Sequence, residues 1–360
     1  MVPDSDKIND LPDNPLYVGF TSGTTSLPKA FLQTQDAWLN SFNASTEEFG
    51  IKSGDSILIT GRLNYGFSLY PAIEGLFRGA TIYILKKHDI SKISKIMTER
   101  TKLTIYSVPT ILFDIVQEIE EKDIICNNVN KIITSGAKLE NILSTKINKY
   151  MPNANIFEYY GASELGFVSV RKLSENKNAK GSVGVPFKGV EIQVRKRKDM
   201  NSKIGEIWVK SKYISFGYLF NNGTPAFHKD GEWATVGDLG YIDNSELFII
   251  GRQEDMIISG GNNIYFSEIE DVLKSMDGIS DAVATWKNDK RLGQLLCVIL
   301  ITSKSITYTD IYTYCEKHLP HYKIPKKFYQ CTSFSRNNND KVSRKIITDN
   351  IERGEYYELQ

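Results

Sequence analysis

Residues 103–136 read LTIYSVPTILFDIVQEIEEKDIICNNVNKIITSG, and this stretch decides the expected fold. Two short runs rich in β-branched residues, 103–108 and 131–136, indicate strands. Between them, residues 109–121 place apolar side chains at helical spacing. A strand, a helix and a second strand in this order predict two parallel strands with a helix packed over them.

The same alternation extends on both sides of this unit, from Leu16 to Tyr160. Further strands are expected at 55–60, 80–85 and 154–161, and further helices at 67–79, 91–100 and 141–150. The series predicts an α/β fold in which a flavodoxin-like parallel sheet is covered by helices.

The pattern changes after residue 181. Strand-like runs broken by Gly, Asn and Asp, with no helical period, predict an antiparallel β unit over residues 182–251. A small α+β domain is expected over residues 252–360, with strands near 282–286 and 295–301 and helices at 267–276 and 309–319. Ser267 is the expected cap of the first of these helices. The expected division is therefore 1–181, 182–251 and 252–360.

Composition excludes several classes of protein. The formal net charge of +1 gives no overall field that would attract nucleic acid or an anionic membrane. The longest apolar run, LLCVILI, is too short to cross a membrane, and the polar start MVPDSDKIND does not resemble a signal peptide. The cysteines lack metal or redox spacing, which favours a reducing cytoplasm; they are Cys126, Cys297, Cys315 and Cys331.

The stretch FTSGTTSLPK, residues 20–29, is dense in hydroxyls and backbone donors. Successive backbone N–H groups in such a loop can form a concave site for an anion, and Lys29 adds a positive charge. This composition suggests phosphate binding, although the loop lacks the spacing of the common nucleotide-binding loop. The alternative interpretation is a polar hairpin loop that binds nothing.

Four more stretches place polar residues beside turns or glycines. YYGASELG contains Glu164, TVGDLGYID contains Asp238, Arg252 precedes a double glycine, and NNDKVSRK contains Lys341. Each has an ordinary interpretation by itself, as a solvated acid or a surface lysine. In this order, from Tyr17 to Lys345, they resemble the motif series of the adenylate-forming superfamily, most closely bacterial fatty-acid-type acyl-CoA synthetases.

The resemblance implies a role for each motif. ATP would be bound by residues in five stretches: Thr21, Ser22, Gly23, Thr24, Thr25, Lys29, Ser135, Gly136, Ala137, Tyr160, Gly161, Ser163, Asp238 and Arg252. Within this set, Tyr160 would lie against adenine and Asp238 would bind the ribose hydroxyls. Lys341 and Glu164 would be the catalytic residues, and Glu164 would also hold Mg2+. Tyr65 and Gly136 would border the acyl pocket, Gly260 and Gly261 would line the path of CoA, and Glu254 would be the hinge of a mobile C-terminal domain.

The implied reaction joins a carboxylic acid to ATP, giving an acyl-adenylate, and then transfers the acyl group to CoA. Residues 61–76 contain no Asp to pair a substrate ammonium, which disfavours an α-amino acid and favours a fatty acid. An aryl-acid CoA ligase, an acyl-AMP ligase that loads a carrier protein, and a non-catalytic nucleotide-binding remnant stay open as alternatives.

Two departures from the family pattern bear on activity. Ser26 stands where the family has Gly in the phosphate loop. If that position needs a positive φ, Ser would weaken phosphate binding by the loop. Only about twenty residues precede the loop, whereas relatives carry an N-terminal subdomain there. Without this subdomain the chain would expose an apolar face. We therefore expect either an oligomer that buries the face or a missing N-terminal subdomain that covers it.

Overall fold

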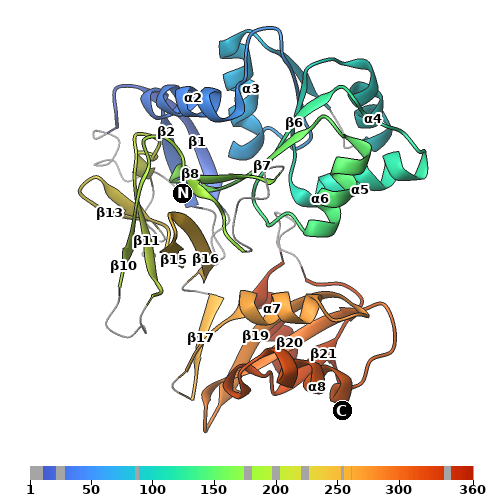
Figure 1. The fold of residues 1–360 in the computed structure, drawn as a ribbon. Helices are drawn as coiled ribbons and strands as arrows, with labels where there is room; N and C mark the ends of the chain where they lie inside the picture. The colour runs from blue at the N-terminus through green and yellow to red at the C-terminus, as the bar shows by residue number, and fades with distance from the viewer. Residues whose placement is uncertain are drawn as a thin grey trace. The chain divides into compact units, whose positions relative to one another are not determined.

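The computed structural model describes residues 11–21, 29–85, 89–173, 181–196, 203–219, 227–252, 255–260, 262–335 and 342–359. The chain separates into two compact units, the first running to Ile249 and the second beginning at Ile250 (Figure 1). The finer three-part division expected from the sequence stays a prediction. No helix among the described residues is long and apolar enough to span a membrane.

A seven-stranded sheet forms the centre of the first unit, in the order β4-β3-β5-β6-β7-β8-β9. Its first five strands are parallel, and in chain order they follow the flavodoxin arrangement 2-1-3-4-5. The expected parallel sheet is therefore confirmed. The strands are β3 (Ser56–Ile59), β4 (Thr81–Ile84), β5 (Leu103–Tyr106), β6 (Val129–Thr134), β7 (Asn155–Ala162), β8 (Gly166–Lys172) and β9 (Val185–Pro186).

Helices pack on both faces of this sheet. Three of them, α4 (Ile90–Glu99), α5 (Pro109–Glu121) and α6 (Asn141–Tyr150), share one core with the strands and lie together in Figure 1. The other core includes residues of α2 (Gln35–Phe49) and α3 (Gly66–Arg78). No sequence pattern indicated α2, whose first turn is capped by the Thr34 hydroxyl accepting from the Ala37 N–H.

Antiparallel strands complete the first unit. One sheet has the order β13-β14-β11-β15-β16, with β10 paired to β11, and a smaller sheet has the order β1-β2-β12. The strands of the larger sheet are β10 (Glu191–Arg195), β11 (Gly205–Lys210), β13 (His228–Asp230), β14 (Trp233–Thr235), β15 (Asp238–Asp243) and β16 (Glu246–Arg252), whose end belongs to the second unit. Those of the smaller sheet are β1 (Pro15–Thr21), β2 (Lys29–Thr34) and β12 (Gly217–Tyr218).

The second unit has the α+β architecture expected from the sequence. Its strands are β17 (Met256–Ser259), β18 (Asn262–Tyr265), β19 (Ile279–Asp289), β20 (Gly293–Thr302), β21 (Lys327–Gln330) and β22 (Tyr357–Glu358). Its helices are α7 (Phe266–Lys274), α8 (Tyr308–His318), the 3-10 turn His321–Lys323 and α9 (Arg344–Glu352). Both faces of the β19–β20 hairpin are buried, because its alternate side chains enter two different cores.

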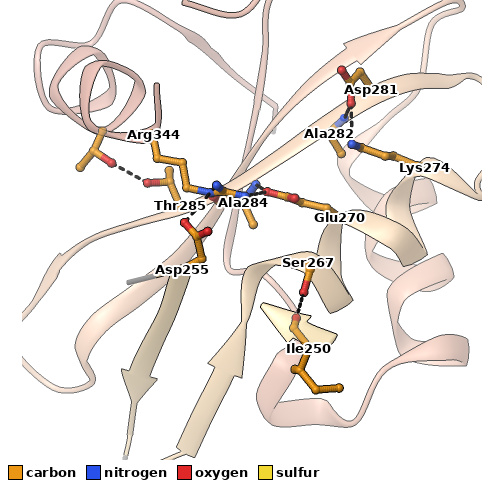
Figure 2. Close-up of polar contacts among 11 residues, drawn as sticks. Ile250, Asp255, Ser267, Glu270, Lys274, Asp281, Ala282, Ala284, Thr285 and Arg344 are labelled. Atoms are coloured by element: carbon orange, nitrogen blue, oxygen red, sulfur yellow. Dashed lines mark hydrogen bonds and ion pairs between the residues drawn. The ribbon is translucent and has the colours of Figure 1, made fainter. Parts of the chain in front are cut away.

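The predicted cap of α7 is wrong. The helix begins one residue earlier than expected, with Tyr265 at the cap position and no side chain capping it. Ser267 lies inside the first turn, where its hydroxyl donates instead to the carbonyl oxygen of Ile250 (Figure 2). A serine beside a helix start is a weak signal because a distant carbonyl can compete for its hydroxyl.

Candidate functional site

The carboxyl ends of the parallel strands define where a ligand is expected. In a sheet of this order, ligands bind outside the strand ends at the point where the order reverses, here between β3 and β5. At that point the Thr60 hydroxyl donates to the Ser107 hydroxyl at 2.8 Å. On the next strand along, Ser135 follows β6 and donates to the Tyr159 carbonyl oxygen at 2.8 Å. Polar side chains therefore collect at this edge of the sheet.

Two predicted site residues from different sheets are in direct contact. Tyr160 lies near the end of β7, and its hydroxyl donates to the carboxylate of Asp238 at the start of β15. Asp238 is 5% exposed, so its carboxylate is held in place rather than solvated. The residues that the resemblance assigned to adenine and ribose are thus brought together across 78 positions of sequence.

Glu164 is also a buried acid, and it is 7% exposed. The hydroxyl of Tyr218 donates to Glu164 Oε1 at 2.6 Å, and the Ser215 N–H donates to the Glu164 carbonyl oxygen at 2.8 Å. Tyr218 reaches this position because β12 pairs with β2, where it lies opposite Phe31. An oriented carboxylate oxygen suits a hard cation such as Mg2+, so the chemistry of this donor fits the predicted role.

The surroundings of Glu164 contain two titratable groups whose pKa values are displaced. Burial, and then the negative charge of Glu164, raises the pKa of Tyr17 to about 12. Burial lowers the pKa of Lys229, whose ammonium donates to the carbonyl oxygens of Ser215 at 3.0 Å and Phe216 at 2.8 Å. Lys229 therefore fastens the segment that leads into Tyr218.

Sequence reasoning missed Tyr17, Tyr218 and Lys229. Each is an isolated tyrosine or lysine, and no local pattern distinguishes them from the many others in the chain. Their importance depends on the pairing of β12 with β2, which joins segments far apart in the sequence.

The remaining predicted residues of the sheet edge differ in exposure. Gly136 has a φ of +87°, a conformation that glycine adopts readily, and Ala137 and Ser163 are exposed. Tyr65 precedes α3 and is 41% exposed. A Cβ atom placed on the next residue, Gly66, would lie 3.2 Å from the Tyr17 hydroxyl and 4.0 Å from the Ser163 hydroxyl.

A close backbone approach explains the glycine after Tyr160. A Cβ atom on Gly161 would lie 2.3 Å from the carbonyl oxygen of Gly166, on the antiparallel neighbour β8. Only glycine fits this position without a backbone shift. The turn that carries Ser163 and Glu164 is therefore tightly closed.

The predicted phosphate loop connects two paired strands. Thr21 ends β1 and Lys29 begins β2, and the two residues are partners in the antiparallel ladder. In the second unit, Arg252 ends β16, and Gly260 has a φ of +56° with its N–H donating to the Leu292 carbonyl oxygen at 3.0 Å. Seven predicted site residues lie outside the described residues: Ser22, Gly23, Thr24, Thr25, Glu254, Gly261 and Lys341.

Two family models match this chain. The model of AMP-binding enzymes covers residues 3–219, and the model of AMP-binding enzyme C-terminal domains covers residues 268–341. The chain therefore belongs to the AMP-binding enzyme family, and the resemblance to the adenylate-forming superfamily is confirmed. Its class is that of AMP-forming acid–thiol ligases, as expected from the motifs.

Individual relatives agree with this assignment. The uncharacterized acyl–CoA ligase YhfT of Bacillus subtilis is 33% identical over 350 residues, which are 96% of this chain and 71% of that protein. The putative long chain fatty acid–CoA ligase VraA of Staphylococcus haemolyticus is 31% identical, over 95% of this chain and 70% of that protein. The solved O-succinylbenzoate CoA synthetase MenE of B. subtilis, in complex with ATP and magnesium, aligns with a TM-score of 0.80 and 27% identity, over 91% of this chain and 68% of that one.

Proposed function

We propose that this protein activates a carboxylic acid with ATP and passes the acyl group to the thiol of CoA. In the first step a carboxylate oxygen forms a bond to the α-phosphorus of ATP, and the bond to the leaving pyrophosphate breaks. In the second step the CoA sulfur bonds to the acyl carbon, the thiol proton is lost to solvent, and AMP leaves. The contact between Tyr160 and Asp238 carries this proposal, because it joins the two segments assigned to adenine and ribose.

The nucleotide would be held by groups from all three sheets of the first unit. The ring of Tyr160 would lie against adenine, while Asp238 would accept hydrogen bonds from the ribose hydroxyls, supported by Arg252. The loop between β1 and β2 would bind the β- and γ-phosphates through Thr21, Ser22, Gly23, Thr24, Thr25 and Lys29. Ser163 would contact phosphate, and Ser135, Gly136 and Ala137 would separate adenine from the acyl group.

Glu164 would be the ligand for Mg2+ in this scheme. A bound Mg2+ would neutralise phosphate charge, and such ions are held by one or two carboxylates together with substrate phosphates. Tyr218 supports that role, because its hydroxyl donates to one oxygen of the Glu164 carboxylate and fixes the orientation of the carboxylate. Lys229 in turn stabilises the segment before Tyr218.

Lys341 would supply the positive charge for adenylation. Negative charge builds on the carboxylate and on the α-phosphate as they approach, and an ammonium between them lowers the barrier. Removing one such preorganised group costs about 100- to 1,000-fold in rate. Residues 252–360 would carry this lysine, with Glu254 as the hinge and with Gly260 and Gly261 beside the path of CoA.

The acid is proposed to lack an amino group, with a fatty acid as the first candidate. An aryl acid is the second candidate, and one observation favours it. Two residues after Tyr65 in the sequence, the ring of Phe67 lies 6.3 Å from that of Tyr106 and 6.1 Å from that of Tyr159. A flat aromatic acid would find ring partners beside this layer, in which Tyr106 is fully buried.

The proposal is tested by product formation from ATP, Mg2+, CoA and a panel that includes octanoate, palmitate and benzoate. We expect acyl-CoA and AMP in equal amounts with at least one acid, and a loss of both in Lys341→Ala. AMP and acyl-adenylate without acyl-CoA would favour loading of a carrier protein instead. A folded protein that forms neither product with any acid would refute catalysis and favour the non-catalytic remnant.

A further inference from the structure

One arginine in the second unit joins three separate segments of chain. Arg344 is the first residue of α9, and its Nη1 donates to Asp255 at 3.1 Å, while its Nη2 donates to Glu270 on α7 at 2.7 Å (Figure 2). Its Nε donates to the carbonyl oxygen of Ala284 on β19 at 3.1 Å. The guanidinium carbon also lies 5.4 Å from the centre of the Phe266 ring.

The acceptors around Arg344 are linked to one another. Glu270 Oε1 accepts from the backbone N–H of Ala284 at 2.9 Å as well as from Arg344. One carboxylate oxygen of α7 therefore binds both the backbone of β19 and the Arg344 guanidinium. The side chain of Glu270 is 13% exposed, and those of Asp255 and Arg344 are 29% and 31% exposed. Charge-assisted hydrogen bonds with this degree of shielding are stronger than those of a freely solvated pair.

Another ion pair of helix α7 provides a contrast. Lys274 on α7 contacts Asp281 on β19 at 2.9 Å, with side chains that are 44% and 40% exposed. Figure 2 shows this pair together with the contacts of Arg344. An exposed pair of this kind contributes little to stability. Lys274 therefore serves as a control for the loss of one cation from an ion pair that involves α7.

Ser343, which directly precedes α9, is also held by hydrogen bonds. The Ser343 N–H donates to the Ser335 carbonyl oxygen at 3.0 Å, so residues on either side of the intervening segment are joined. The Ser343 hydroxyl caps α9 by accepting from the Ile346 N–H. Arg344, next in the chain, joins this hydrogen-bonded start of α9 to Asp255 and to Glu270 on α7.

We propose that Arg344 is a positioning residue that holds the start of α9 to the start of the second unit. This inference rests on the proposed function, in which Lys341 lies three residues before Arg344 and the hinge at Glu254 directly precedes Asp255. The clamp holds the start of α9, which follows the lysine in the sequence, to Asp255, which follows the hinge. It therefore supports adenylation, which needs Lys341, more than acyl transfer to CoA, which does not.

Hydrogen–deuterium exchange tests the clamp without any knowledge of the acid. Wild type, Arg344→Ala, Arg344→Lys and Lys274→Ala are compared in peptides that cover residues 255–260 and 342–348. Arg344→Ala should accelerate exchange in both peptides, Arg344→Lys should do so less, and Lys274→Ala should leave both unchanged. Equal protection of both peptides in Arg344→Ala and wild type would overturn the proposal.

The two half-reactions test the positioning role. Adenylation is followed by ATP–pyrophosphate exchange with the octanoate and benzoate probes, and transfer by the reaction of synthetic benzoyl-AMP and octanoyl-AMP with CoA. A misplaced group can cost about 100-fold, so Arg344→Ala should slow adenylation by about tenfold or more. Transfer should change much less, and Arg344→Lys should recover part of the loss.

Equal slowing of both half-reactions in Arg344→Ala would mean a general structural defect and would overturn the positioning role. A wild-type protein without any pyrophosphate exchange would instead refute the proposed function. In that case the deuterium result still decides whether Arg344 holds the two segments together.

Discussion

Glu74 provides a prediction that depends on the fold alone. It lies on α3 and is 1% exposed, with one carboxyl oxygen accepting from the Ser45 hydroxyl at 2.9 Å. The other oxygen has no hydrogen-bond partner among the residues that the structure describes. Burial raises the pKa of Glu74 from 4.5 to about 8, while the Ser45 hydrogen bond and the charge of Arg78 act in the opposite direction.

The sign of the effect follows from proton linkage. The folded protein keeps a proton on Glu74 between pH 4.5 and about 8, whereas the unfolded chain loses it. The corresponding stability is fully present below pH 4.5 and is lost as the pH rises through about 8. A displacement of about 3.5 pKa units corresponds to about 5 kcal/mol in the free energy of unfolding, as an upper bound.

The change to make is Glu74→Gln, which keeps the shape of the protonated acid and cannot ionise. Urea unfolding, followed by tryptophan fluorescence between about pH 5 and pH 9, should show wild type losing several kcal/mol relative to this variant. Glu121→Gln is the control, because Glu121 is exposed on α5 and its loss should leave the pH dependence intact. Parallel curves for Glu74→Gln and wild type would refute the reasoning.

Three further substitutions follow from contacts in the first unit. Arg171→Met should lower the free energy of unfolding by about 3–5 kcal/mol, because Glu158, which accepts from Arg171 Nε at 2.8 Å, would lose this buried counter-ion and keep only the hydrogen bond from the Leu139 N–H. Tyr218→Phe should raise the Mg2+ concentration needed for half-maximal activity by about tenfold, because it frees the Glu164 carboxylate. Gly184→Ala should destabilise the fold by about 3 kcal/mol or more, since φ is +94° and the new Cβ would lie 2.0 Å from a carbonyl oxygen.

Each of these three predictions would be contradicted by one specific result. Gly181→Ala is the control for Gly184→Ala, because Gly181 has a φ of +91° and a Cβ added there would meet no atom of the described residues within 4 Å. Similar losses in both variants would contradict the steric argument. An unchanged Mg2+ requirement in Tyr218→Phe would remove Tyr218 from the site. Unaltered urea unfolding of Arg171→Met would contradict the burial argument.

The sequence predicted best those elements whose signals are local. Helix α5 forms over residues 109–121 as expected, because Pro109 starts it and its apolar residues recur on one face. Helix α2 was not expected, since Ser, Asn and Thr dilute its pattern. It forms because small residues such as Ser41 and Ser45 pack tightly against its neighbours, and tertiary packing overrides weak local propensity.

In the candidate site, too, the local motifs were predictable and the long-range contacts were not. The motifs that contain Tyr160, Glu164 and Asp238 were recognisable in the sequence, but their mutual arrangement was not. The hydrogen bonds from Tyr160 to Asp238 and from Tyr218 to Glu164 span 78 and 54 positions. Such contacts arise only when β7 meets the antiparallel sheet and β12 joins β2, and no local spacing encodes these pairings.

The most direct test of the proposed chemistry is acid-dependent exchange of labelled pyrophosphate into ATP in the absence of CoA. This exchange reports the reversible formation of an acyl-adenylate and nothing later. We predict exchange that requires both Mg2+ and one class of carboxylic acid, and that falls by about 100-fold or more in Lys341→Ala. A folded wild-type protein that gives no exchange with any acid, or exchange that Lys341→Ala leaves unchanged, would contradict the proposal.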